Sequence, residues 1–135
     1  MPVREILFLG NPVLRHSCAV VKAPLADEIR SIISDLRDTL SDFHSRRGFG
    51  RGIAAPQIGS SQRVIVVNAD YSGPMINPII VKSSRKKFRL WDDCFSFPDI
   101  LVHVERNYSV EVAFVDEQGK KKRLQAEGSF SELLQ

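Results

Sequence analysis

The sequence predicts an α+β fold, in which one long N-terminal helix is followed by antiparallel β-sheets and by the start of a second helix. Apolar side chains recur at helical spacing over residues 27–43, and short β-branched or alternating runs follow between residues 63 and 126. A chain of 135 residues has the size of one domain and can bury a real core. We therefore expect residues 1–135 to form a single domain.

The N-terminal helix is the best-defined element of the sequence. Pro24, followed by the acidic pair Asp27 and Glu28, favours a helix start, and Gly48 favours an end near residues 44–47. Between these signals the apolar residues follow the helical period: Ile29, Ile32, Ile33, Leu36, Leu40 and Phe43.

The segments typical of β-strands are, in order, residues 63–68, 75–81, 86–91, 101–115 and 121–126. Pro78 cannot donate a hydrogen bond within a sheet, so the second segment predicts an edge strand or a bulge. Residues 116–119 are typical of a hairpin turn. Residues 3–9 are apolar enough for a short strand or an extended entry.

The last residues begin a helix. Ser129 and Glu132 have the spacing of a capping box, and Leu133 and Leu134 start an apolar stripe. The sequence ends at Gln135, less than two turns later, and so short a helix is not stable alone in water. Truncation of a longer helix is the simplest expectation.

Composition excludes several classes of protein. A net charge of +3 is too small to predict nucleic-acid binding, and the lysine clusters at residues 85–87 and 120–123 favour solvated strand edges. No apolar run approaches a membrane span, and the N-terminus carries no cleavable apolar segment, so we expect a cytoplasmic protein. Cys18 and Cys94 are far apart, which favours free thiols or a metal ligand over a disulfide.

The stretch from Gly50 to Gly59 is the first candidate functional loop. Gly50-x-Gly52-x-x-Ala55 fits a loose dinucleotide fingerprint, but the loop follows a helix rather than a strand, and Pro56 falls where the crossover helix would run. The loop also carries Gln57, whose amide needs hydrogen-bond partners that a substrate could provide.

The second candidate lies around Cys94, which is flanked by two aspartates and by aromatic residues. A buried thiol is the ordinary interpretation of a free cysteine. The neighbouring acids disfavour a nucleophilic thiolate, so a metal ligand makes better sense. We expect His16, His44 and His103 to be structural or exposed to solvent.

Together these stretches resemble the peptide deformylases, metallohydrolases that remove the formyl group from N-formylmethionine on new polypeptides. Residues 50–59 (GRGIAAPQIG) are similar to the family's first motif, G-x-G-(I/L)-A-A-x-Q-x-G, and residues 92–96 (DDCFS) to its second, E-G-C-L-S. Residues 10–15 and 76–78 match as well. The family's third motif, H-E-x-x-H with Gln before the first histidine, would begin where this sequence ends.

The resemblance implies a role for each matching residue. Cys94 would be a thiolate ligand to a divalent metal, commonly Fe(II) with Zn, Ni or Co as substitutes, and the two absent histidines would complete the set. The metal would lower the pKa of a bound water, and the absent glutamate would take its proton. The Gln57 side chain and the Phe95 backbone N–H would stabilise the oxyanion.

For the substrate, the resemblance implies that Gly50, Arg51 and Gly52 hold an N-formylmethionyl peptide as an added strand. Asp93 stands where the family usually has Gly, beside the substrate. Asp92 replaces Glu, and we hypothesise that it pairs with Arg106 to brace the cysteine loop. The implied partners are nascent chains at the ribosome, with no membrane and no specific nucleic acid.

Three interpretations remain open from the sequence. The first is a deformylase lacking its H-E-x-x-H helix, in which residues 1–135 alone are inactive. The second is an inactive relative that binds peptide N-termini or the ribosome. The third is an unrelated α+β interaction module that matches by chance, which ten motif positions in order disfavour.

Overall fold

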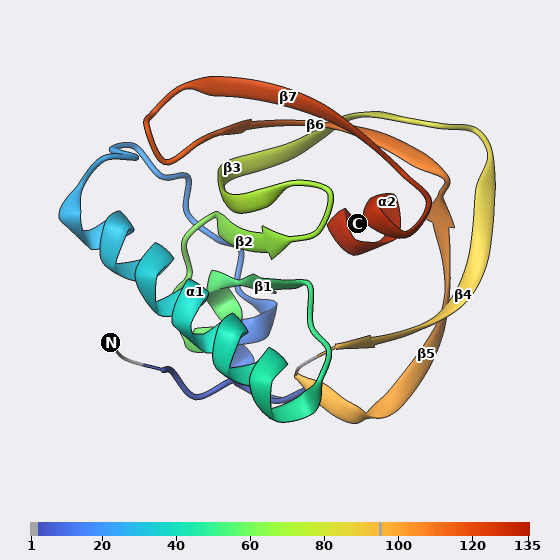
Figure 1. The fold of residues 1–135 in the computed structure, drawn as a ribbon, viewed down its shortest axis with the longest axis horizontal. Helices are drawn as coiled ribbons and strands as arrows, with labels where there is room; N and C mark the ends of the chain where they lie inside the picture. Colours follow the sequence, from blue (N-terminus) through green and yellow to red (C-terminus); the bar gives the residue numbers. More distant parts are fainter. Residues whose placement is uncertain (1–2, 95) are drawn as a thin grey trace.

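The computed structural model of the chain describes residues 3–94 and 96–135, without the side chains of residue 93 and residues 97–100. Its α+β architecture, drawn in Figure 1, contains the elements η1 (Pro12–Arg15), α1 (Asp27–Arg47), β1 (Gly52–Ala54), η2 (Ala55–Ile58), β2 (Val64–Asn68), β3 (Ser72–Ser83), β4 (Lys87–Cys94), β5 (Phe97–Asn107), β6 (Ser109–Val115), β7 (Lys121–Glu127) and α2 (Gly128–Leu134). The predicted fold class is confirmed.

Helix α1 has the predicted boundaries for the predicted reasons. Asp27 and Glu28 lie in its first turn, where the helix dipole favours negative charge. It ends at Gly48, whose backbone takes the left-handed conformation (φ 78°) and donates to the His44 carbonyl. The apolar face is buried against β1, β2 and η2.

The strands form an antiparallel sheet in the order β1-β2-β3-β6-β7 and a separate β4–β5 ribbon. Alternation along β2 directs Val64 and Val66 to the core beneath α1, and Val67 to a second core on the opposite face of the sheet. The alternating segment 101–115 is divided at Tyr108, because β5 belongs to the ribbon and β6 to the sheet.

The interruption at Pro78 is a bulge, and the strand that contains it is not at an edge. β3 lies between β2 and β6, and its register shifts between Ile76 and Ile79. Asn77 takes a positive φ of 53° there, and its side chain accepts from the Val21 N–H (2.8 Å) and donates to the Val21 carbonyl (2.9 Å). Residues 3–8 form no strand, so the extended entry is the correct alternative.

Helix α2 is held by tertiary contacts, as its length requires. Phe130 packs in the second core, and the Gln135 side chain brackets Asn107 of β5 by donating to its carbonyl (2.7 Å) and accepting from its N–H (2.9 Å). The predicted capping box is wrong. The N-cap is Glu127, which makes no side-chain cap bond, and the Glu132 carboxylate pairs with Arg51 instead.

Helix α2 lies between the sheet and the β4–β5 ribbon (Figure 1) and contacts β5, β6 and β7. It therefore faces the ribbon that carries Cys94. No helix in the described part of the chain is long and apolar enough to cross a membrane.

Candidate functional site

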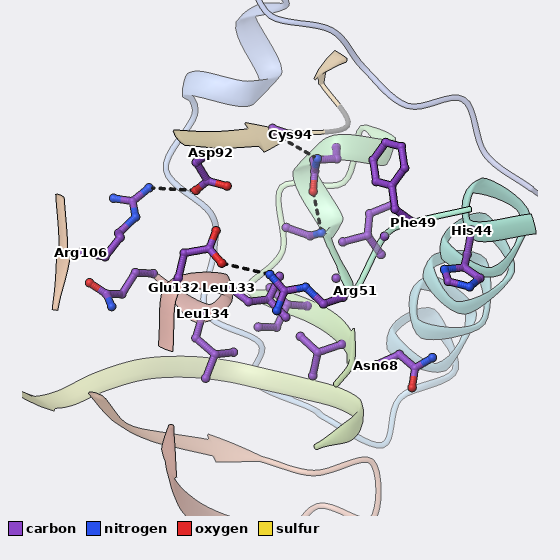
Figure 2. Close-up of a pocket in the computed structure, with 18 residues that line it drawn as sticks. His44, Phe49, Arg51, Asn68, Asp92, Cys94, Arg106, Glu132, Leu133 and Leu134 are labelled. Atoms are coloured by element: carbon purple, nitrogen blue, oxygen red, sulfur yellow. Dashed lines mark hydrogen bonds and ion pairs between the residues drawn. The ribbon is translucent and has the colours of Figure 1, made fainter. Parts of the chain in front are cut away.

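A cavity of about 700 Å³ brings both candidate loops together. This is within the range usual for small-ligand sites. Its walls come from the end of α1, the loop before β1, the β4–β5 ribbon and α2, as Figure 2 shows. Among the residues that line it are Gly50, Arg51, Gly52, Gln57, Asp92, Cys94, Arg106, Glu132, Leu133 and Gln135.

Gln57 is oriented by its own backbone. Its Oε1 accepts from the Ala54 N–H at 2.9 Å, three residues earlier. The amide nitrogen is therefore the end that faces the cavity, where it donates to Cys94 Sγ (3.4 Å) and to Ser96 Oγ (3.3 Å). Both N–H donors of the Gln57 amide are thus aimed at the loop that carries Cys94 and Ser96.

Cys94 ends strand β4 as a half-buried free thiol. Phe95, the second predicted oxyanion donor, lies outside the described residues. The side chain of Asp93 also lies outside the part of the chain that the structure describes. Its predicted effect on a substrate therefore stays a prediction. Of the predicted catalytic and metal residues, the structure thus brings Gln57 and Cys94 into contact.

The predicted substrate segment leads into β1, an edge strand of the sheet. β1 pairs only with β2 among the described strands, and the Arg51 carbonyl accepts from the Asn68 N–H at 2.7 Å. Gly52 lies close beneath α2, since a Cβ placed there would stand 3.3 Å from Leu133 Cδ1. The edge of β1 beside the cavity offers backbone groups to an extended chain.

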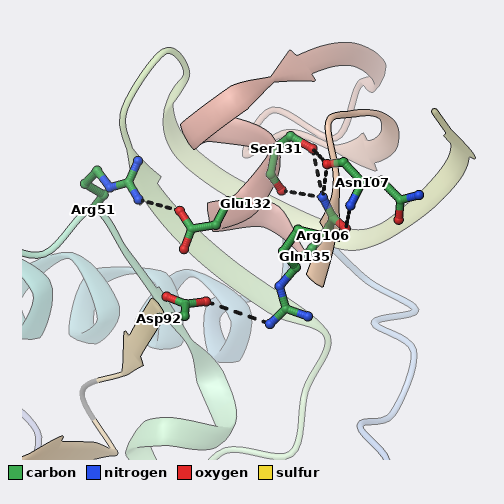
Figure 3. A network of polar contacts seen from close by, with 7 residues as sticks. All are labelled: Arg51, Asp92, Arg106, Asn107, Ser131, Glu132 and Gln135. Atoms are coloured by element: carbon green, nitrogen blue, oxygen red, sulfur yellow. Dashed lines mark hydrogen bonds and ion pairs between the residues drawn. The ribbon is translucent and has the colours of Figure 1, made fainter. Parts of the chain in front are cut away.

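Four charged side chains form a network across the cavity, shown in Figure 3. Arg51 Nη2 lies 3.0 Å from Glu132 Oε2, and Arg106 Nη2 lies 3.8 Å from Asp92 Oδ2. The second pair is the one hypothesised from the sequence. The first was missed, because Glu132 was assigned to a capping box and the partners are 81 residues apart.

Burial raises the pKa of Glu132 above its ordinary value of 4.5, and a hydrogen bond with Asp92 raises it further. Arg51 acts in the opposite direction on this pKa but does not outweigh burial. Glu132 therefore takes up a proton more readily than an exposed glutamate does.

This raised pKa predicts how Glu132 affects stability. A carboxyl group with a higher pKa in the folded state binds more protons folded than unfolded, so its contribution is fully present below pH 4.5 and is lost as pH rises through the folded-state value. We expect the stability of the wild type relative to Glu132→Gln to fall over this interval. Urea unfolding of both proteins at several pH values between about 4 and 8 measures the difference. A difference that is flat with pH contradicts the assignment.

The histidines do not join Cys94. His44 lines the α1 end of the cavity, and Figure 2 places Phe49 between it and Cys94. His103 packs against the exposed Trp91 with ring centroids 5.0 Å apart and ring planes tilted by 42°, and His16 is exposed at the end of η1.

An open catalytic metal site needs about three protein donors. Among the described residues no group of three His, Cys, Asp or Glu side chains could hold a metal ion. Cys94 is a suitable soft donor, but the described residues do not fit a metal on their own.

Known proteins are similar to this chain in sequence and in fold. A sequence profile described as polypeptide deformylase matches residues 3–135. The peptide deformylase of Picosynechococcus is 35% identical over 140 residues, which cover 99% of this chain and 72% of that protein. The peptide deformylase of Rhizobium meliloti is 33% identical over 141 residues, which cover 100% and 78%.

Solved structures agree with the sequence matches. The peptide deformylase of Thermotoga maritima superposes with a TM-score of 0.89 at 27% identity, covering 99% of this chain and 88% of that one. The enzyme of Synechococcus elongatus in complex with actinonin gives a TM-score of 0.89 at 30% identity, covering 99% and 71%. The chain therefore belongs to the polypeptide deformylase family, the hydrolases that remove the N-terminal formyl group from newly made polypeptides.

Proposed function

We propose that the cavity binds an N-formylmethionyl peptide and that Gln57 and Cys94 mark the place of its formyl group. One observation carries the proposal: the Gln57 amide nitrogen is held 3.4 Å from Cys94 Sγ within the cavity. Hydrolysis adds a water oxygen to the formyl carbon and breaks its bond to nitrogen, which releases formate and a free amine. Negative charge gathers on the formyl oxygen during the addition.

Gln57 is the residue placed to stabilise that charge. Its Nε2 is directed into the cavity by the bond between its Oε1 and Ala54, so a formyl oxygen could replace the weak contact with sulfur. A donor fixed in advance stabilises a developing oxyanion without reorganisation. The Phe95 backbone N–H is the second donor that we propose.

The substrate backbone would extend the sheet at β1. Gly52 begins the edge strand β1 and lies close to α2, which supports Gly50, Arg51 and Gly52 as the segment that we propose for contact with the substrate backbone. Asp93, in the strand that leads to Cys94, is the remaining residue that we propose beside the substrate.

Cys94 is the one metal ligand that we assign, to a divalent metal that is Fe(II) first, with Zn, Ni or Co as substitutes. Residues 1–135 contain no His-Glu-x-x-His sequence, the motif that supplies the other ligands and the catalytic glutamate in the family. We therefore propose that residues 1–135 alone bind metal weakly and do not hydrolyse formyl peptides.

The partners that we propose are nascent chains at the ribosome, in the cytoplasm, without a specific nucleic-acid or membrane partner. The mild net charge of +3 supports the part of this proposal that concerns nucleic acid.

Peptide binding by residues 1–135 tests the proposal without requiring turnover. Titration with formyl-Met-Ala-Ser should shift the backbone amide resonances of Gly50, Arg51 and Gly52 and the side-chain amide of Gln57. Unformylated Met-Ala-Ser should bind more weakly, because it lacks the formyl oxygen. Shifts confined to residues outside the cavity would contradict the proposal.

A further inference from the structure

The cavity contains an ion pair that joins its two walls. Arg51 belongs to the loop before β1, and Glu132 belongs to α2. Besides the 3.0 Å contact with Glu132, Arg51 donates to the Ser129 carbonyl at 3.3 Å. The Glu132 side chain is only 9% exposed and that of Arg51 is 43% exposed, so the pair reaches from the buried wall of the cavity to its open side. Figure 3 shows the two side chains facing each other.

The position of the pair relative to the formyl site follows from the sheet edge. Gln57 bonds to Ala54, at the end of β1, so a formyl group at Gln57 lies beside the end of that strand. The first side chain of a peptide that runs along β1 then follows about one residue further along the peptide and lies beside Gly52. The cavity wall at this point has an apolar part, which includes Val67 and Leu133, and a charged part, which is the Arg51–Glu132 pair.

The Arg51–Glu132 pair carries one positive and one negative charge, and the neighbouring Asp92–Arg106 pair adds one of each. Asp92 lies against Glu132 and is itself 3.8 Å from Arg106, so the two acids are adjacent and each has one arginine on its outer side. A charged group that enters such a partly buried site meets a like charge and disrupts an existing pair, at a cost that removing one partner would relieve. An uncharged, unbranched side chain such as that of methionine keeps the pair intact.

We propose that Arg51 and Glu132 are specificity-determining residues, whose ion pair restricts the first side chain of the substrate to uncharged groups. This inference rests on the proposed function, since it takes the cavity as the substrate site. The selection then depends on both charges of the pair. Removal of the Glu132 charge leaves Arg51 unpaired and should favour an acidic first side chain in the substrate, and removal of the Arg51 charge should favour a basic one.

The test uses residues 1–135 and three formyl peptides that begin with Met, Glu or Lys and end in Ala-Ser. NMR titration gives the ratio of each charged peptide's affinity to that of the Met peptide. The wild type should bind both charged peptides at least about tenfold more weakly. Glu132→Gln should raise the Glu/Met ratio about tenfold, and Arg51→Met should raise the Lys/Met ratio in the same way.

A surface ion pair supplies the matched control. Arg37 and Glu117 lie 2.9 Å apart with both side chains well exposed, so Glu117→Gln removes the same charge away from the cavity. It should leave both ratios unchanged. Glu132→Gln preserves the shape of the side chain and a hydrogen bond to Arg51, so it decides the question even where Arg51→Met fails to fold.

The outcomes separate the two proposals. Wild-type binding at the cavity with ratios that Glu132→Gln leaves unchanged overturns the role of the ion pair and leaves the proposed function standing. The same holds where Glu117→Gln changes the ratios as much as Glu132→Gln does. Failure of the wild type to bind any of the three peptides at the cavity overturns both.

Discussion

A chain in which a His-Glu-x-x-His helix is joined directly after Gln135 should bind one divalent metal ion and release formate from formyl-Met-Ala-Ser, whereas residues 1–135 alone should do neither. The residue after Gln135 stands four positions after Glu132, and helical side chains four positions apart share a face. Glu132 contacts Asp92 on the strand that ends in Cys94. The first added histidine would therefore face that strand, and the second would follow one turn later.

Metal analysis and formate release measure this prediction. An extension of the same length with both histidines replaced by alanine is the control, and it should behave like residues 1–135. Strong activity from residues 1–135 alone would contradict the assignment of the missing ligands. It would require His16, His44 or His103 to reach the site.

Replacement of Gln57 by alanine in the extended, metal-binding chain should lower kcat/KM by about 10²–10³-fold, the usual effect of losing one oxyanion donor. The side chain lies beside Cys94 and is directed by the Ala54 N–H, so its removal deletes a donor aimed at the reacting carbonyl. Metal content should not change, because an amide that donates to sulfur is not itself a ligand.

Gln118→Ala is the matched control, since Gln118 is exposed in the turn between β6 and β7. It should leave kcat/KM unchanged. A loss of metal in Gln57→Ala that parallels the loss of rate would show that Gln57 acts through the ligand sphere, and would contradict its role as a donor to the formyl oxygen.

Local patterns were enough to predict most of the fold. The period of residues 29–43 and the glycine at 48 predicted α1 and its end, and Pro78 predicted the bulge in β3. These signals succeed because the helical period and the missing proline N–H act within a few residues. The division at Tyr108 was not predicted, because the alternation of β5 and β6 is similar although the two strands join different sheets.

The candidate site was predicted only where its residues lie in the two motifs. Gln57 and Cys94 were found through them, and the Asp92–Arg106 pair was hypothesised from a departure from the second motif. Arg51 and Glu132 were not paired, since nothing local links side chains that the fold brings together over 81 positions. Glu132 also has a competing local interpretation, and tertiary structure overrides it.

The bond between Gln57 Oε1 and the Ala54 N–H has a consequence for conformational entropy. Fixing a free glutamine side chain costs up to about 2 kcal/mol in lost rotamers. Here the backbone of the same short turn fixes it, so the cost falls on folding and does not recur with each substrate. Any substitution that loosens the turn at residues 54–57 should therefore slow the reaction through disorder in Gln57, even where every group that touches the substrate is retained.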